Sequence, residues 1–349
     1  MVASDSREPV PGIDPAGVTA WLAERTEITP PLSFEVVEGG RSNLTYRVAD
    51  ADGRRLVLRR PPLHGVLESA HDMGREHRII SALAGSEVPV PRCIGYEPTD
   101  EVTGAPFYVM EHVDGEVIRD AEVAGELAPA ARTAVSQDLV DVLVGLHATD
   151  IDAVGLGDLA RREAYIERQL KRWHRQLQEG RTRELPLLDE VHDRLAAAVP
   201  EQGPAAIVHG DYRLDNLIVD PGEGRVRAVL DWELTTLGDP LADLGLLLVY
   251  WAEPGDQPIS LLDSPTLVAG FASRQELIDR YAAASGRDLD DIGYFVAFGY
   301  WKLACVLEGV YTRTRSGAYG GDTSGAEAFG DLVIELGERA AEAAEEAGR

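Results

Sequence analysis

Three oxygen-bearing side chains in the middle of the chain have the types and the spacing that phosphate chemistry requires. Asp211 and Asn216 lie five residues apart on one short segment, and Asp231 follows after a predicted turn and strand. A carboxylate such as that of Asp211 can orient an attacking hydroxyl and accept its proton. Carboxylate and amide oxygens, such as those of Asp231 and Asn216, are ligands that Mg²⁺ prefers. The sequence therefore indicates a site for phosphoryl transfer, in which such ligands hold Mg²⁺ against the phosphates.

The segment around Asp211 resembles the catalytic loop of a known family. His209, Gly210 and Asp211, followed by Asn216, are similar to the H-G-D motif and its asparagine in the aminoglycoside phosphotransferases, which are relatives of the protein kinases. The resemblance implies that Asp211 is the catalytic base and that Asn216 binds Mg²⁺. An isolated H-G-D also fits an ordinary turn, because Gly-Asp pairs are common in turns.

Two later segments extend the resemblance. The tripeptide DWE that begins at Asp231 is similar to the metal-binding segment of the family, which implies that Asp231 is the second Mg²⁺ ligand. Residues 238–244, GDPLADL, resemble the segment that usually follows, and they imply that Asp243 braces the catalytic loop. His209 would likewise help to hold this loop. Three such elements in the expected order are harder to obtain by accident than one motif.

A glycine-containing loop near residue 40 is a candidate contact for the nucleotide phosphates. The loop lies between two predicted strands, and its backbone N–H groups can approach phosphates because glycine lacks a Cβ. By resemblance we expect Gly40, Ser42 and Asn43 to contribute to nucleotide binding. The loop lacks the G-x-G-x-x-G pattern, and by itself it is no more than a hairpin turn.

Two charged residues and the end of a predicted strand complete the candidate nucleotide site. Arg59 occupies the place where the family usually has a Lys that reaches the α- and β-phosphates. The resemblance carries this role to Arg59, with Glu76 on the following helix as its ion-pair partner. Arg59 also fits a solvated strand end, and Glu76 also fits a surface charge on a helix. By the same resemblance, backbone groups near Glu111 and Val113 would bind the edge of the adenine.

Hydrophobic patterning predicts the elements that position these residues. In the first part of the chain it predicts helices at residues 18–25 and 71–83 and strands at residues 34–37, 44–48, 55–59, 92–96 and 107–111. After residue 127 it predicts helices at 131–147, 163–179, 188–198, 240–251, 274–284, 291–312 and 326–347, and short strands at 205–208, 217–219 and 226–230. His147, at the end of one helix, is expected to be a structural residue that caps carbonyl groups.

The predicted fold class is α+β, with the two-lobed architecture of the protein kinases. The first lobe, residues 1–112, would contain a five-stranded antiparallel sheet plus one helix and would bind the nucleotide. We expect residues 1–14, which are rich in charge and proline, to form a flexible tail. The second lobe, residues 113–349, would be mainly helical and would hold the catalytic loop and the acceptor site.

Composition argues against several classes of protein. The 349 residues carry a formal net charge of −27, which repels nucleic-acid phosphates, so we expect no nucleic-acid partner. No run approaches the roughly 18 apolar residues that a membrane helix needs, so we expect no membrane partner. The N-terminus lacks the apolar region of a secretory signal, and we therefore expect a cytoplasmic protein. The sequence gives no indication of the oligomeric state.

These features predict an enzyme that uses ATP and Mg²⁺ and moves the γ-phosphate to a hydroxyl of a small molecule. The family name suggests an aminoglycoside acceptor, and the acidic chain suits a polycation. The LRRPP pattern that begins at Leu58, together with residues 104–111, is closer to the kinase-like domains associated with acyl-CoA dehydrogenases, which favours a hydroxyacyl-type metabolite. A choline- or homoserine-like alcohol is a third candidate. The alternative is a catalytically silent kinase-like nucleotide-binding module, which the Arg59 replacement favours.

Overall fold

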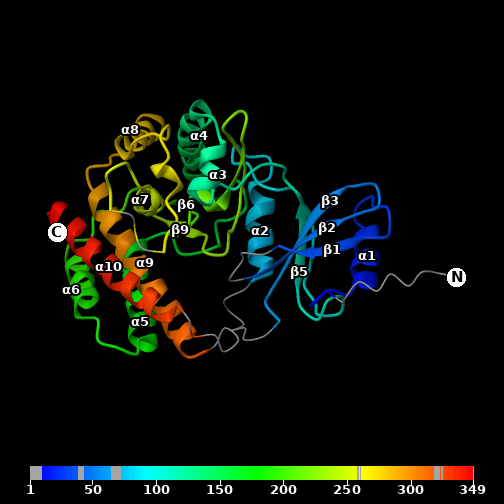
Figure 1. Ribbon diagram of the computed structural model, residues 1–349, viewed down its shortest axis with the longest axis horizontal. Helices are drawn as coiled ribbons and strands as arrows, with labels where there is room; N and C mark the ends of the chain where they lie inside the picture. Colours follow the sequence, from blue (N-terminus) through cyan, green and yellow to red (C-terminus); the bar gives the residue numbers. More distant parts are fainter. Residues whose placement is uncertain are drawn as a thin grey trace. The chain divides into compact units, whose positions relative to one another are not determined.

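The computed structural model describes residues 10–37, 43–63, 72–257, 259, 261–317, 323 and 325–348. The chain forms two compact units, Met1–Asp114 and Gly115–Arg349, and Figure 1 shows their elements. An antiparallel sheet dominates the first unit and helices dominate the second. The predicted α+β fold class is therefore confirmed.

The first unit is built on a five-stranded antiparallel sheet with the strand order β1-β2-β3-β5-β4. Its strands are β1 (Ser33–Val36), β2 (Leu44–Ala49), β3 (Arg55–Arg60), β4 (Cys93–Glu97) and β5 (Phe107–Glu111). The turn between β2 and β3 contains Gly53 with a φ of 85°, a conformation that glycine adopts without steric cost. The register of β3 against β5 places Arg59 opposite Tyr108.

Two helices cover the sheet of the first unit, α1 (Pro15–Ala23) and α2 (Met73–Leu83). Successive side chains of a strand point to opposite faces of a sheet. Phe107 and Val109 of β5 accordingly pack with Leu22 of α1 in one buried cluster, whereas the Tyr108 hydroxyl donates a hydrogen bond to Glu76 of α2. Both faces of β5 are thus buried, and α2 brings Glu76 against one of them.

The described part of the segment before α1 is fixed to the first unit. The expected flexible tail covered residues 1–14, of which residues 1–9 lie outside the described residues. The Tyr46 hydroxyl donates a hydrogen bond to the Pro11 carbonyl at 2.6 Å, and the Arg60 guanidinium donates to the Gly12 carbonyl. The Asp14 side chain then caps the first turn of α1. These contacts order residues 11–14 on the sheet.

The second unit is mainly helical, as predicted. Its helices are α3 (Ala121–Glu126), α4 (Pro129–Ala148), α5 (Tyr165–Gly180), α6 (Pro186–Ala197), α7 (Leu241–Tyr250), α8 (Arg274–Ser285), α9 (Ile292–Arg315) and α10 (Ala326–Glu346), with 3-10 turns at Leu214–Asn216 and Pro265–Leu267. Strand β6 (Ala206–Val208) pairs with β9 (Thr236–Gly238), and β7 (Leu217–Asp220) pairs with β8 (Arg225–Val229). The sequence did not predict α3 or β9, because both are too short to show a clear hydrophobic period.

Helix α9 lies in the core of the second unit, where it packs against α5, α7 and α10 (Figure 1). Its sequence from residue 294 to residue 307 is largely apolar, and Phe298 and Trp301 are almost fully buried. At Gly245 of α7, an added Cβ would lie 2.5 Å from the Phe295 carbonyl oxygen of α9. Glycine therefore permits the close approach of α7, which follows the catalytic segment, to α9.

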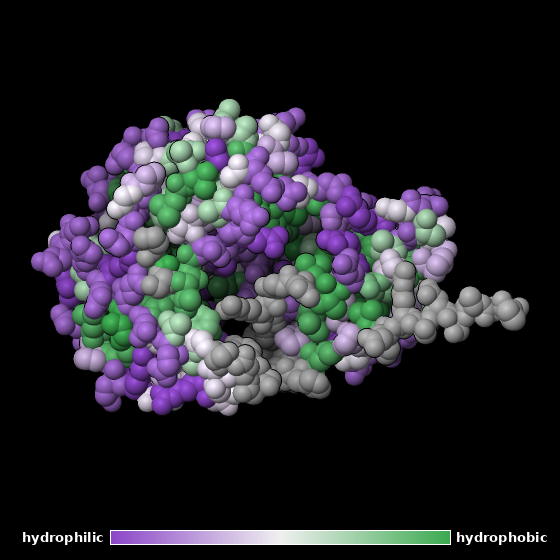
Figure 2. Space-filling model, in the orientation of Figure 1, coloured by the Kyte–Doolittle hydropathy of each residue, from purple (hydrophilic) through white to green (hydrophobic). Residues whose placement is uncertain are grey.

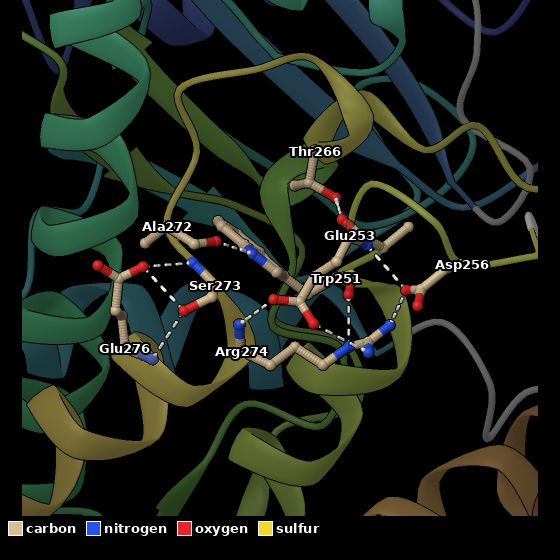
Figure 3. A network of polar contacts seen from close by, with 9 residues as sticks. Trp251, Glu253, Asp256, Thr266, Ala272, Ser273, Arg274 and Glu276 are labelled. Carbon is tan, nitrogen blue, oxygen red and sulfur yellow. Dashed lines mark hydrogen bonds and ion pairs between the residues drawn. The ribbon is translucent and has the colours of Figure 1, made fainter.

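The connection between α7 and α8 is held by a polar network around Arg274, which Figure 3 shows from close by. The Arg274 guanidinium donates to the Trp251 carbonyl at 2.7 Å and to the carboxylate of Glu253 at 3.2 Å, and it also contacts Asp256. The Trp251 indole donates to the Ala272 carbonyl at 2.8 Å. The start and the end of this connection are therefore tied together.

Hydrophilic residues cover most of the visible face of the protein, with smaller hydrophobic areas between them (Figure 2). This distribution agrees with the formal net charge of −27. Within the part of the chain that the structure describes, we find no helix with the length and hydrophobicity needed to span a lipid bilayer.

Candidate functional site

The loop that carries Asp211 begins where β6 ends, and its geometry depends on Gly210. Gly210 has a φ of 87°, and an added Cβ would lie 2.8 Å from the Leu234 carbonyl oxygen. A side chain at this position would therefore be strained and would clash with the backbone. The Asp243 carboxylate accepts hydrogen bonds from the backbone N–H groups of His209 at 2.6 Å and of Gly210 at 2.8 Å. The predicted bracing of this loop by Asp243 is confirmed.

His147 supports Asp243 from the end of α4. Its Nε2 lies 3.2 Å from the Asp243 carboxylate, and its Nδ1 lies 2.7 Å from the Tyr281 hydroxyl. His147 is therefore a structural residue, as expected, but its ring turns into the core toward a carboxylate and does not cap the carbonyl groups of the helix end. Burial would raise the pKa of Asp243, but hydrogen bonds from His147 and from the Gly210 backbone lower it overall. Asp243 is thus held as a buried carboxylate.

Asp211 and Asn216 are in direct contact. The Asn216 side-chain amide donates to the Asp211 carbonyl at 2.8 Å and to the Asp211 carboxylate at 3.0 Å. The 3-10 turn at Leu214–Asn216 closes the short loop between them. Because the amide nitrogen faces Asp211, the amide oxygen of Asn216 faces away from it and is oriented to accept or to bind a cation.

Asp231 is placed beside this loop through its neighbour Leu230. The Leu230 backbone N–H donates to the Asn216 carbonyl at 2.8 Å, and His209 Nε2 lies 2.9 Å from the Leu230 carbonyl. Asp231 follows directly, with a φ of 63° that is uncommon for a residue other than glycine. The structure thus brings the segments of all three predicted residues, Asp211, Asn216 and Asp231, together.

Arg213 is a site residue that the sequence analysis missed. Its Nε lies 3.4 Å from the Asp211 carboxylate, and its Nη1 donates to Asp215 at 2.9 Å. The guanidinium also lies 4.8 Å from the centre of the Tyr250 ring. Burial lowers the pKa of Arg213, but Asp211 and Asp215 raise it overall. Its position two residues after Asp211 was the signal that could have revealed it.

The first unit contains a second polar cluster, centred on Glu76. The Glu76 carboxylate, which is 1% exposed, lies 3.6 Å from the Arg59 guanidinium. It also accepts hydrogen bonds from the Asn43 amide and from the Tyr108 hydroxyl, each at 3.0 Å. The structure therefore brings together three predicted residues, Asn43, Arg59 and Glu76. Tyr108 was missed, because a tyrosine in a buried strand gives no signal of its polar partner.

The remaining predicted nucleotide contacts are described only in part. Gly40 and Ser42 lie outside the described residues. The Glu111 carboxylate is paired with the Arg92 guanidinium, and the Glu111 backbone N–H donates to the Arg92 carbonyl at 2.9 Å. Val113 is half-buried near the end of the first unit. The Glu111 N–H is therefore already used within the sheet.

The donor types at Asn216 and Asp231 fit Mg²⁺. The fit rests on the orientation of the Asn216 amide, whose nitrogen is engaged by Asp211 and whose oxygen is directed away. Among the described residues, no group of three or more His, Cys, Asp or Glu side chains could hold a metal ion. An Asn and an Asp are nevertheless sufficient protein ligands for Mg²⁺, because it usually retains waters and binds substrate phosphates.

The comparisons with known proteins agree with this geometry. Residues 33–292 match the family model described as the phosphotransferase enzyme family. The chain belongs to this family. A solved structure from Ralstonia eutropha that is assigned to the aminoglycoside phosphotransferases has a TM-score of 0.82 and 32% identity, covering 95% of this chain and 98% of that chain. The resemblance to the aminoglycoside phosphotransferases, which the H-G-D motif indicated, is therefore confirmed.

Relatives of this phosphotransferase family member include much longer proteins. Acyl-CoA dehydrogenase family member 10 of Mus musculus is 35% identical over 318 residues, which cover 90% of this chain and 29% of that protein. The chain thus spans less than a third of that relative. The streptomycin–ATP complex of APH(2")-IIa has a TM-score of 0.56 and 17% identity, covering 88% of this chain and 91% of that chain. At that identity the likeness shows the fold alone.

Proposed function

We propose that this chain transfers the γ-phosphate of ATP to a hydroxyl of a small molecule, with Asp211 as the catalytic base. The observation that carries the proposal is a set of three hydrogen bonds: His209 Nε2 to the Leu230 carbonyl, the Leu230 N–H to the Asn216 carbonyl, and the Asn216 amide to the Asp211 carboxylate. Together these bonds hold the segments of Asp211 and Asp231 against each other. The Asp211 carboxylate orients the acceptor hydroxyl for in-line attack and accepts its proton. Asn216 and Asp231 would hold Mg²⁺, which when bound offsets charge on the phosphates.

In this proposal residues 1–112 are the nucleotide-binding lobe. Arg59, oriented by Glu76, contacts the α- and β-phosphates as the usual Lys does. A planar guanidinium can bind phosphate with two parallel hydrogen bonds, so the replacement is compatible with this role. The existence of an ATP complex for a protein with the same fold supports ATP as the donor. Residues 113–349 would hold the catalytic loop and the acceptor site.

For the acceptor we favour a hydroxyacyl-type metabolite over an aminoglycoside. The support is the mouse relative, whose name contains acyl-CoA dehydrogenase and whose similarity extends over 90% of this chain. The Ralstonia structure, assigned to the aminoglycoside phosphotransferases, supports the second candidate at a comparable identity of 32%. The two acceptor classes differ in charge, because aminoglycosides are polycations and acyl compounds are neutral or anionic.

The test is release of ADP from Mg·ATP in the presence of hydroxyacyl compounds and of aminoglycosides, each in separate reactions. We expect turnover with the wild-type chain and a hydroxyacyl acceptor. Asp211→Asn keeps the size of the side chain but removes the base, so turnover should fall by about 10²- to 10⁴-fold with ATP binding retained. Asp290→Asn is the matched control, because Asp290 is an exposed carboxylate that lies just before α9, outside the candidate site. Wild-type turnover in Asp211→Asn would disprove the assignment.

The second candidate is a silent nucleotide-binding module, and the Arg59 replacement is the observation that favours it. Such a module would bind ATP but would release no ADP above background with any acceptor. Binding measured by calorimetry and turnover measured by ADP release therefore separate the two functions. Equal background rates in the wild-type and Asp211→Asn proteins would favour the silent module.

A further inference from the structure

Helix α9 carries a buried lysine whose side chain reaches the candidate catalytic loop. Lys302 is 8% exposed, and its ammonium donates a hydrogen bond to the Gly210 carbonyl at 2.8 Å. The chain contains one other lysine, Lys171, which is exposed on α5. Lys302 also lies beyond residues 33–292, the range that matches the family model.

The peptide group that Lys302 contacts is the one directly before Asp211. Its carbonyl, from Gly210, accepts from Lys302, and its N–H, from Asp211, donates to His209 Nδ1 at 3.2 Å. The preceding N–H, from Gly210, is held by Asp243. Side chains from the loop, from α7 and from α9 therefore fix the backbone on both sides of the Gly210 Cα. This backbone sets the direction in which the Asp211 side chain leaves the chain.

The surroundings of Lys302 hold its side chain in place. The ring of Trp173 on α5 has its centre 5.9 Å from the Lys302 ammonium, and the Arg172 guanidinium lies 5.1 Å from the same ring. Burial lowers the pKa of Lys302, whereas the charges of Asp211 and Asp243 oppose this effect. The ammonium thus lies in a dry setting close to two carboxylates.

We propose that Lys302 is a positioning residue for phosphoryl transfer, which fixes the Gly210 carbonyl and thereby the direction of Asp211. The inference rests on the proposed function of Asp211. Glycine at position 210 makes the loop conformation possible, but glycine also leaves the adjoining peptide groups free to rotate. A buried donor that holds the carbonyl removes this freedom. Misplacement of a reacting group by about 1 Å can cost about 10²-fold in rate.

Thermodynamics separates this role from a purely structural one. A buried ammonium carries a desolvation cost, so its replacement by a neutral chain of similar length removes that cost. The replacement leaves one carbonyl without its donor, which opposes the gain. We therefore expect the midpoint of urea unfolding of Lys302→Met to lie close to that of the wild-type chain. A residue needed only for stability would instead lower this midpoint.

The experiment compares Lys302→Met and Lys302→Gln with the matched control Lys171→Met. ADP release from Mg·ATP is measured with the best acceptor of the wild-type chain, and urea unfolding is measured for each protein. We expect the two Lys302 variants to lose about 10²-fold in kcat, with the KM for ATP unchanged, because Lys302 acts on the base and not on the nucleotide. Lys171→Met should retain wild-type kcat and KM.

The outcomes distinguish this inference from the proposed function. If the wild-type chain is active and Asp211→Asn is inactive, but both folded Lys302 variants match Lys171→Met, the inference on Lys302 is wrong and the proposed function stands. If the wild-type chain releases no ADP above the Asp211→Asn background, both are wrong. If Lys302→Met does not fold, the kcat of Lys302→Gln tests the inference. The Gln amide is a polar group that can form hydrogen bonds within the core, but its side chain is too short to place a donor where the Lys302 ammonium lies.

Discussion

His209 Nε2 donates a hydrogen bond to the Leu230 carbonyl at 2.9 Å, and this contact joins the Asp211 segment to the Asp231 segment. The direction of the bond follows from the other ring nitrogen. His209 Nδ1 accepts from the Asp211 backbone N–H at 3.2 Å, so the ring hydrogen is on Nε2. One buried imidazole therefore sets the spacing between the two candidate carboxylates.

Removal of this imidazole should uncouple the two segments. His209→Phe keeps a ring of similar size but leaves the Leu230 carbonyl and the Asp211 N–H without their partner. Buried groups that lose a partner cost about 1–3 kcal/mol each, so urea unfolding should show a loss of at least this size. ADP release should fall by about tenfold or more, because one of the two hydrogen bonds that hold the Asp231 segment against the Asp211 loop is lost.

The control for this prediction is His192→Phe on α6, where the histidine ring lies 2.9 Å from the Asp193 carboxylate, outside the catalytic segment. We expect this variant to retain the wild-type rate of ADP release. If His209→Phe also retained the wild-type rate and stability, the imidazole would not be needed to align the two segments.

The Asp211–Asn216 contact was predictable from the sequence, whereas the contacts that hold the loop from outside were not. A tight turn of five residues leaves few ways to place the two side chains, so their spacing in the sequence is enough to predict that they lie close together. Lys302 contacts Gly210 across 92 residues, and Tyr108 contacts Glu76 across 32 residues. Such pairs depend on how helices and strands pack, and no local pattern records them.

The same distinction applies to the elements. Helix α4 buries residues that lie three or four positions apart, and strand β3 buries every second residue. The predicted bounds of both elements lie close to the observed ones. Strand β9 has only three residues, and it exists because it pairs with β6. His147 was expected to cap a helix end, but the fold brings Asp243 next to its ring. Tertiary contacts, which a local pattern does not contain, decided both cases.

Glu76 is expected to control nucleotide affinity through Arg59. Glu76→Gln keeps the shape of the side chain, removes its charge and replaces one acceptor oxygen by a donor that faces Asn43 or Tyr108. The Arg59 guanidinium then loses the partner 3.6 Å away. We expect the Kd for Mg·ATP, measured by calorimetry, to rise by about tenfold, equivalent to about 1.4 kcal/mol.

Tyr108→Phe is the matched variant for this prediction, because it removes one hydrogen bond to Glu76 and leaves the charge in place. It should weaken Mg·ATP binding less than Glu76→Gln does. Equal Kd values for the wild-type and Glu76→Gln proteins would show that the Arg59–Glu76 pair does not act on the nucleotide.

His147 should make the stability of the protein depend on pH. Burial lowers the pKa of His147 below the ordinary value of about 6.5, although the hydrogen bond to Asp243 opposes this effect. As the pH falls below about 6.5, the unfolded chain therefore binds a proton before the folded chain does, and the free energy of unfolding decreases. The decrease continues until the pH passes the folded pKa, and each unit of pKa difference costs about 1.4 kcal/mol.

The measurement is urea unfolding between about pH 7.5 and pH 5.5, the range just around the ordinary histidine pKa. His147→Gln does not titrate and can still donate to Asp243, so it should show a smaller decrease than the wild-type chain. The lowered pKa of Asp243 acts in a separate range, because its contribution is lost only as the pH falls below the ordinary aspartate pKa of about 3.9. Equal slopes in the two proteins would mean that His147 does not cause the dependence.

Arg274 should keep the two ends of the connection between α7 and α8 tied together (Figure 3). Its guanidinium contacts the Trp251 carbonyl and the carboxylates of Glu253 and Asp256, all of them partly buried. Arg274→Ala removes these contacts at once. We expect a loss of about 1–3 kcal/mol in urea unfolding, because charge-assisted hydrogen bonds are lost together. Chymotrypsin should also cut faster between residues 251 and 273.

Arg280→Ala on the same helix is the control for Arg274→Ala. Arg280 pairs with Asp141, but both side chains are more exposed than those of the Arg274 pairs. Exposed ion pairs contribute about 0–1 kcal/mol, so this variant should change stability little and should leave the cleavage rate in the 251–273 connection unchanged. Two outcomes would contradict this prediction: faster cleavage between residues 251 and 273 in Arg280→Ala, or a wild-type cleavage rate in Arg274→Ala. Either outcome would show that the Arg274 network does not protect this connection from cleavage.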